Sequence, residues 1–317
     1  MVLLPFLASA LLAQSQPAGS TPPTATVAAA PTLKPMGSVL FIGNSFLFGS
    51  GSAVRFHQAN TVTDLNGTGF GGVPALFKTF ATQAGLDFTV SHETVSGSGL
   101  DLHLEKKADL IGRAWDRVVM VSQSLLNTAQ PGNPDVLIRS AKQLAELLHS
   151  KNPAVDIRLV ATWSRADHVY PAKGHWHGQP IEQMAKDVRA AHDRAAATTP
   201  FIRGVIPVGE AWNRAFRAGV ADPNPYDGVA YGQVDLWAHD QWHASTYGYY
   251  LEALVIFGDL TGLDPRSLGK NERSAWELGL SPAQATALQQ VAFDEVSAQR
   301  PNRKLEPFTA ISLGKNG

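Results

Sequence analysis

Hydrophobic and polar positions are arranged along the chain in blocks that predict alternating buried strands and amphipathic helices. Residues 39–42, VLFI, form the short apolar run that is typical of a central parallel strand covered on both faces. Strands are expected at residues 39–42, 86–95, 116–123, 155–163 and 201–209. Helices are expected at residues 73–85, 135–150, 181–197, 244–262 and 281–300. This alternation predicts a three-layer α/β/α fold around a five-stranded parallel sheet of flavodoxin-like order.

The beginning of the chain resembles an export signal. Its first residues, MVLLPFLASALLAQ, combine a short apolar run with the small residues Ala8, Ala10 and Ala13. The run is too short to span a membrane. Because no Lys or Arg precedes Lys34, a disordered apolar tail is the alternative interpretation. We expect an exported protein, periplasmic or secreted, with no integral membrane segment in its mature form.

The domain boundaries follow from changes in composition. We expect a signal peptide at residues 1–18, an Ala, Pro and Thr-rich spacer at residues 19–36, one folded domain at residues 37–300 and an irregular tail at residues 301–317. Residues 49–72 are rich in Gly, Thr and Asn, and we expect them to form a long loop.

Composition excludes several classes of function. The formal net charge of −1 and the sequence pI near 6.8 provide no basic field for nucleic acid, so a polar, neutral substrate fits better. The chain contains no cysteine, which removes disulfides, thiolate metal sites and a cysteine nucleophile.

Two short segments carry candidate catalytic chemistry. The first strand ends on Gly43, Asn44 and Ser45, which places Ser45 at the carboxyl end of a parallel strand, where ligands bind in such sheets. Ser45 is therefore either a loop residue or a nucleophile. A serine hydroxyl needs a base, and His243, oriented by Asp240 three residues earlier, is the candidate. Both segments are expected to meet at the same edge of the sheet.

Four segments together resemble the SGNH or GDSL hydrolases. They are FIGNSF at residues 41–46, SGSGLDLHLE at residues 96–105, WDRVVMVSQS at residues 115–124 and DQWHAS at residues 240–245. The resemblance implies that Ser45 is the nucleophile, that Asp240 and His243 complete a triad, and that no metal or cofactor takes part.

The resemblance also implies an oxyanion hole formed by the N–H groups of Ser45 and Gly97 and by the carboxamide of Gln123. The position of His103 favours Gly97 over Gly99 as the second donor. Gln123 stands where the family usually has Asn in Gly-x-Asn-Asp, and Asn44 stands where Asp is commoner.

These observations predict a serine ester hydrolase for short acyl esters, with O-acetyl groups on a carbohydrate or another small polar molecule as the expected substrate. One alternative is a lipase or thioesterase, in which residues 49–72 form an acyl pocket lined by Phe46, Phe48 and Phe70. Another alternative is an exported binding protein of the same fold without catalytic activity, because Gln123 replaces the usual oxyanion donor.

Other polar and aromatic residues suggest further roles. His239 and His243 have the i, i+4 spacing of zinc-protease histidines, although the segment resembles a loop. A loop carries His168, His175 and His177, which can line the cleft or bind a metal. Tryptophans fall at strand ends or in loops, where they either stack on a sugar or pack the loops: Trp163, Trp176, Trp237 and Trp242. We expect Asn44, Trp163, His175 and Trp242 to contact the substrate.

Overall fold

The computed structural model describes residues 32–300, 302 and 304–313. The predicted signal peptide and residues 19–31 of the predicted spacer lie outside the described residues. The first strand begins at Lys34, three residues before the expected start of the domain, because its ladder extends back to the pair Lys34–Leu86. Irregular backbone separates Pro35 from Gly37 within this strand.

A parallel sheet forms the centre of the compact unit that begins at Thr32. Its strands are β1 (Lys34–Gly43), β2 (Thr63–Asp64), β3 (Leu86–Thr94), β4 (Arg117–Met120), β5 (Asp156–Val160) and β6 (Ile202–Ile206). The order is β2-β3-β1-β4-β5-β6, and every neighbouring pair is parallel. The predicted α/β fold is confirmed, and the five predicted strands have the flavodoxin-like order. A sixth strand, β2, was not predicted because two residues are too few to show an alternation.

Helices connect the strands and continue after the last one. They are α1 (Ser45–Phe48), α2 (Gly72–Gln83), α3 (Leu100–Ile111), α4 (Asp135–Lys151), α5 (Ala166–Val169), α6 (Glu182–Ala197), α7 (Val208–Arg217), α8 (Thr246–Thr261), α9 (Arg273–Glu277) and α10 (Pro282–Gln299). The five predicted helices are α2, α4, α6, α8 and α10, each with ends within two residues of the prediction. Local signals explain these ends: Ser281 and Gln284, for example, form a capping box at α10.

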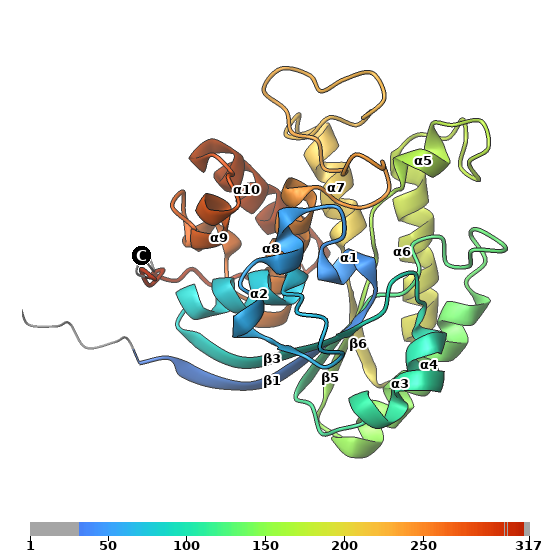
Figure 1. Ribbon diagram of the computed structural model, residues 1–317, viewed down its shortest axis with the longest axis vertical. Helices are drawn as coiled ribbons and strands as arrows, with labels where there is room; N and C mark the ends of the chain where they lie inside the picture. The colour runs from blue at the N-terminus through green and yellow to red at the C-terminus, as the bar shows by residue number, and fades with distance from the viewer. Residues whose placement is uncertain (1–31, 301, 303, 314–317) are drawn as a thin grey trace, which may run out of the picture. The chain divides into compact units, whose positions relative to one another are not determined.

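The helices cover both faces of the sheet (Figure 1). Side chains of α2, α7, α8 and α10 pack on one face, and side chains of α3, α4 and α6 pack on the other. Alternate residues of β1 enter the two layers, with Val39 and Phe41 on the first face and Leu40 and Ile42 on the second. This two-sided burial explains the unbroken apolar run in the sequence.

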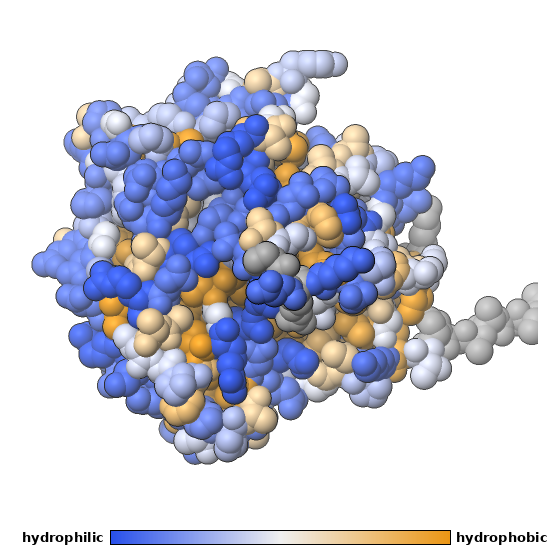
Figure 2. Space-filling model, turned by 180° about the vertical axis from the view of Figure 1, so that it is seen from behind, coloured by the Kyte–Doolittle hydropathy of each residue, from blue (hydrophilic) through white to orange (hydrophobic). Residues whose placement is uncertain are grey.

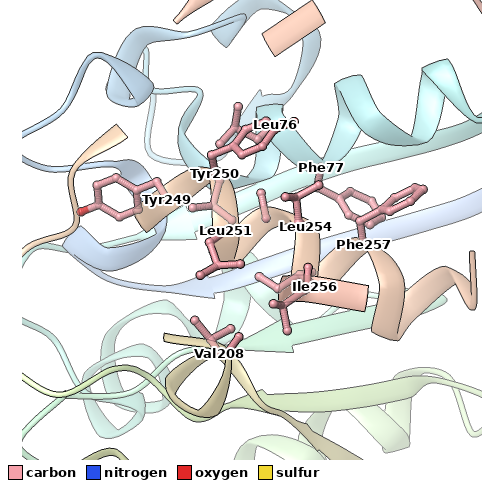
Figure 3. Packing of buried hydrophobic residues seen from close by; sticks show 14 of the residues in the cluster. Leu76, Phe77, Val208, Tyr249, Tyr250, Leu251, Leu254, Ile256 and Phe257 are labelled. Atoms are coloured by element: carbon pink, nitrogen blue, oxygen red, sulfur yellow. The ribbon is translucent and has the colours of Figure 1, made fainter. Parts of the chain in front are cut away.

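The helix α8 is deeply enclosed in the first layer. Every residue from Gly248 to Leu260 is buried. Figure 3 shows its side chains between Leu76 and Phe77 of α2 and Val208 of α7. This packing fixes the start of α8, which directly follows the segment that contains His243.

The polar character of the surface agrees with a core confined to these two layers. Figure 2 shows a face dominated by hydrophilic residues, with hydrophobic residues in small separate groups. None of the helices in the described part of the chain has the length and apolar character needed to cross a membrane.

Two segments outside the regular alternation differ in their secondary structure. Residues 49–71, predicted as loop, contain the 3₁₀ helices η1 (Ala53–Phe56) and η2 (Ala59–Thr61) in addition to β2. After Arg300, the described residues form neither helix nor strand, and a single bridge joins Glu306 to Leu263.

The side chain of Asn44 joins three strand ends at the carboxyl edge of the sheet. Its Nδ2 donates to the carbonyl oxygens of Ser98 (2.9 Å) and Ser122 (3.1 Å), which follow β3 and β4. Its Oδ1 accepts from the N–H of Phe46 (3.1 Å) and so caps α1. Asn44 is buried, and these contacts therefore replace hydrogen bonds to water.

We predict that Asn44→Ala lowers the free energy of unfolding by about 2 to 4 kcal/mol, because it removes a helix cap and leaves two buried carbonyl groups without a donor. Urea unfolding followed by circular dichroism measures this change. Asn271→Ala, at an exposed position, is the control and is expected to stay within about 0.5 kcal/mol of the wild type. Equal stability of the Asn44 variant and the wild type would contradict this role.

Candidate active site

Ser45, His243 and Asp240 form a continuous chain of hydrogen bonds. The Oγ of Ser45 lies 2.9 Å from Nε2 of His243, and Nδ1 of His243 lies 2.6 Å from Oδ2 of Asp240. An ionised carboxylate only accepts hydrogen bonds, so Nδ1 carries the proton and donates it to Asp240. Nε2 is then the acceptor for the Ser45 hydroxyl. The structure therefore brings together the three side chains predicted as a triad.

The turn before α8 keeps Asp240 ionised. Burial raises the pKa of this carboxyl, but hydrogen bonds from the His243 ring and from the N–H groups of His243 and Trp242 outweigh burial, and the pKa lies below its usual value. Gln241, which lies between Asp240 and Trp242 in the sequence, has a φ of 59°, a left-handed conformation that is uncommon for residues other than glycine. The tight turn thus aims backbone donors and the imidazole at one carboxylate.

Ser45 opens into a cavity of about 430 Å³ at the carboxyl edge of the sheet. The residues that line it come from α1, from the turns after β3 and β4, from the segment after β5 and from the turn before α8. They are Asn44, Ser45, Phe46, Gly97, Gln123, Ser124, Leu125, Thr128, Arg165, His168 and Trp242. A cavity of this size with mixed polar and apolar walls suits a small molecule.

The backbone N–H groups of Ser45 and Gly97 have no partner among the described residues. Ser45 is the first residue of α1, where N–H groups have no acceptor within the helix. Gly97 lies in the turn closed by the hydrogen bond from the N–H of Ser98 to the carbonyl of Val95, and its φ of 69° favours glycine. Gly97 lines the cavity, whereas Gly99 is the N-cap of α3. The structure thus separates the two candidates for the second donor.

Gln123 holds the turn that contains Gly97. Its Nε2 donates to the carbonyl of Gly97 (2.6 Å), and its Oε1 accepts from the hydroxyl of Thr128. A carboxamide carries two N–H bonds; one of them is used by Gly97, and the second has no partner among the described residues in the cavity lining that Gln123 joins.

A stack of three side chains borders the cavity, and two of them, Trp242 and Arg165, line it. The Trp242 ring lies against the His243 ring, with centroids 4.5 Å apart and planes at 20°. The guanidinium of Arg165 lies 4.1 Å from the centre of the Trp242 ring and is held by Asp167 through two hydrogen bonds. Sequence reasoning missed Arg165, although its position just after β5 at the carboxyl edge is a signal that could have found it.

Two of the four residues predicted to contact substrate, Trp163 and His175, lie outside the cavity lining. Trp163 is completely buried, stacked between Phe46 and Trp212, so it supports α1 from behind the cavity. His175 is exposed and packs against Trp176. His168, and not His175, lines the cavity. Asn44 does reach the lining, but both N–H bonds of its carboxamide are used by backbone carbonyls.

The remaining tryptophans and histidines are also accounted for. Trp176 and Trp237 are buried, and each indole N–H has a partner, Asp187 and the carbonyl of Ser164 respectively. Of the four tryptophans singled out in the sequence, only Trp242 lines the cavity. His177 bonds to the carbonyl of Tyr170 at the surface.

The zinc-protease spacing of His239 and His243 has no helix to support it. Residues 239–243 form turns and bends, His239 is exposed, and both ring nitrogens of His243 are used by Asp240 and Ser45. Within the described ranges, no group of three or more His, Asp or Glu side chains is arranged to hold a metal ion.

No family model and no curated protein sequence matches this chain. Similar solved structures do exist. A DUF4886 family protein from Bacteroides uniformis is 18% identical, with 86% of this chain and 98% of that chain covered and a TM-score of 0.58. A candidate SGNH hydrolase from Slackia heliotrinireducens is 23% identical, with 71% and 98% covered and a TM-score of 0.47. A candidate GDSL-like lipase from Parabacteroides merdae is 16% identical, with 73% and 98% covered and a TM-score of 0.49.

Identities this low concern the fold alone. At that level, the chain shares its α/β fold with the DUF4886 family protein from Bacteroides uniformis.

Proposed function

We propose that this protein is a serine ester hydrolase with Ser45 as nucleophile, His243 as base and Asp240 as the residue that orients the base. The observation that carries the proposal is the hydrogen-bonded chain from Ser45 through His243 to Asp240, which opens into a cavity beside two N–H groups that lack a partner among the described residues. This arrangement of nucleophile, base and donors suits acyl transfer.

The proposed reaction begins with attack of the Ser45 oxygen on the ester carbonyl carbon. Nε2 of His243 takes the hydroxyl proton and returns it to the departing alcohol, which leaves an acyl group on Ser45. A water molecule, deprotonated by the same nitrogen, then releases the acid and restores the serine. Asp240 stabilises the imidazolium in both steps because its carboxylate stays ionised.

The N–H groups of Ser45 and Gly97, with the second N–H of Gln123, are the proposed oxyanion donors. Gln123 also holds Gly97 in place through its first N–H. The longer side chain of Gln123 still lines the cavity beside Gly97, so it can act as a donor in place of the usual Asn. This geometry favours a hydrolase over a binding protein without catalytic activity.

We infer that the substrate carries a short acyl group on a polar alcohol such as a carbohydrate. The cavity at Ser45 holds a small group, and the cation of Arg165 with the indole of Trp242 offers a polar and aromatic wall for a sugar. The alternative acyl pocket finds less support, because Phe48 and Phe70 surround a cation, Arg55, and Phe46 stacks on Trp163. A long acyl chain would need a continuous apolar channel.

We predict that Ser45→Ala lowers kcat for p-nitrophenyl acetate by at least about 10³-fold, because the nucleophile is removed. A fluorophosphonate should label the wild type and not this variant, and EDTA should leave the rate unchanged. Ser150→Ala is the matched control, since that serine is exposed on α4 and bonds only to the carbonyl of Leu147. Full activity of the Ser45→Ala variant would exclude the proposed mechanism. Loss of wild-type activity on addition of EDTA would exclude it as well.

Measured from pH 5 to 8, kcat/KM should rise with pH and then level off. An imidazole accepts the serine proton only when it is neutral. Asp240 adds no step, because its pKa lies below the usual value. Burial and the charge of Arg165 lower the pKa of His168, the histidine that lines the cavity. Stopped assays across this range in one mixed buffer measure the profile, and a flat profile would argue against His243 as base.

Acetyl esters should be hydrolysed faster than octanoyl esters of the same alcohol, because the cavity at Ser45 is small and partly polar. A series of p-nitrophenyl esters from two to eight carbons measures kcat/KM at each length. The values are expected to fall by about tenfold or more across the series, which corresponds to about 1.4 kcal/mol. A maximum at eight carbons would instead favour the lipase or thioesterase alternative.

A further inference from the structure

A second cavity, of about 490 Å³, is lined in part by sequence neighbours of residues that line the cavity at Ser45. We call it the Arg55 pocket, and its lining includes Arg55, Lys107, Ser50, Thr68, Ser96 and Phe70. The turn after β3 separates the two cavities, since Gly97 lines the first and Ser96 lines the second. Ser50 also links them, because its N–H donates to the carbonyl of Ser45 (3.1 Å).

Arg55 is held in place without a polar partner. Its guanidinium lies 4.1 Å from the centre of the Phe70 ring, 5.2 Å from that of Phe48 and 5.4 Å from that of Phe56. Within the described part of the chain, its side chain makes no hydrogen bond and no ion pair, and its Nε is buried. The rings orient the cation and leave its N–H groups for a ligand.

Lys107 adds a second cation to the same pocket. Its Nζ donates to Oδ1 of Asn66 (2.8 Å) and lies 4.0 Å from Oε1 of Glu93. Glu93 is bound by the ring of His103 and by Asn66, so its charge is shared with other donors.

The other carboxylate of this region, Asp64, is also committed to the protein. It accepts from the N–H groups of Asn66, Thr68, Gly69 and Phe70 and from the Thr68 hydroxyl. Asp64 therefore builds the loop that carries Thr68 and Phe70 and has few lone pairs left for Arg55. The groups of the pocket that remain open to a ligand are cations and hydroxyls.

We propose that the Arg55 pocket is a subsite for an anionic group, a carboxylate or a phosphate, on the alcohol part of the ester that reacts at Ser45. The fork of an arginine matches the oxygens of both groups, and Lys107 and the hydroxyls of Ser50 and Ser96 complete the set of donors. This inference rests on the proposed esterase function, and it narrows the substrate to acyl esters of acidic sugars or sugar phosphates.

The test compares kcat/KM for acetylated glucuronic acid, acetylated glucose 6-phosphate and acetylated glucose. The wild type should prefer at least one anionic ester over the neutral one by about tenfold, as expected for one charge-assisted hydrogen bond. Arg55→Gln should remove this preference without changing the rate on acetylated glucose by more than about twofold. Arg55→Lys should restore part of it. If Arg55→Gln removes the preference for acetylated glucuronic acid, the anion is a carboxylate; if it removes the preference for acetylated glucose 6-phosphate, the anion is a phosphate.

Two further variants keep the test decisive. Lys107→Gln should reduce the same preference and replaces Arg55→Gln if that variant does not fold. Arg139→Gln, at an exposed position on α4, should keep the preference of the wild type. Equal rates on charged and neutral esters in the wild type, or a preference that Arg55→Gln leaves intact, would overturn the proposal.

A binding measurement separates this inference from the proposed function. If the folded wild type hydrolyses none of these esters, the esterase proposal fails, and calorimetric titration with glucuronate, inorganic phosphate and glucose still tests the pocket. Binding of an anion that is lost in Arg55→Gln and kept in Arg139→Gln would support an anion subsite. Absence of anion binding to the wild type would overturn it.

Discussion

The carboxamide of Asn44 is the interaction on which the geometry of the site depends. In a parallel sheet the strand ends β1, β3 and β4 lie at one edge, but nothing in the ladder fixes the turns beyond them. Asn44 bonds to the carbonyls of Ser98 and Ser122, and these residues directly neighbour Gly97 and Gln123. One buried side chain therefore sets the positions of Ser45, which follows it in sequence, and of the other two proposed oxyanion donors.

The other half of the site is positioned by the core. The helix α8 is buried along nearly its whole length, and the hydroxyl of Tyr249 donates to the carbonyls of Ser45 (3.2 Å) and Ser50 (3.0 Å). This contact ties the first turn of α8 to α1. Because the turn that carries Asp240 and His243 leads directly into α8, packing of the helix sets how close His243 comes to Ser45. A core mutation in α8 can thus change the site without touching it.

The sequence predicts those parts of the molecule whose cause is local. Strand and helix periodicity, capping residues and the Asp-x-x-His turn are visible in short windows, and so are the positions of Ser45, Gly97 and Gln123 once the family resemblance is recognised. The failures have a non-local cause. Trp163 at the end of β5 looks the same in sequence whether it faces a cavity or packs against Phe46, and β2 exists only because the edge of β3 is available for two residues.

The charge of the site could not be predicted from composition for the same reason. Composition gives only the net charge, whereas a binding site depends on where the individual charges lie. The formal net charge of −1 favours a neutral substrate as long as opposite charges are assumed to mix evenly. In the segment from η1 to α2 they do not mix: Asp64 accepts hydrogen bonds from backbone donors of its own loop, and Arg55 is enclosed by aromatic rings. Separating the two leaves a cation facing the cavity in a chain that is nearly neutral overall. Such a separation arises only from the folded loop, which is why the net charge of the sequence does not reveal it.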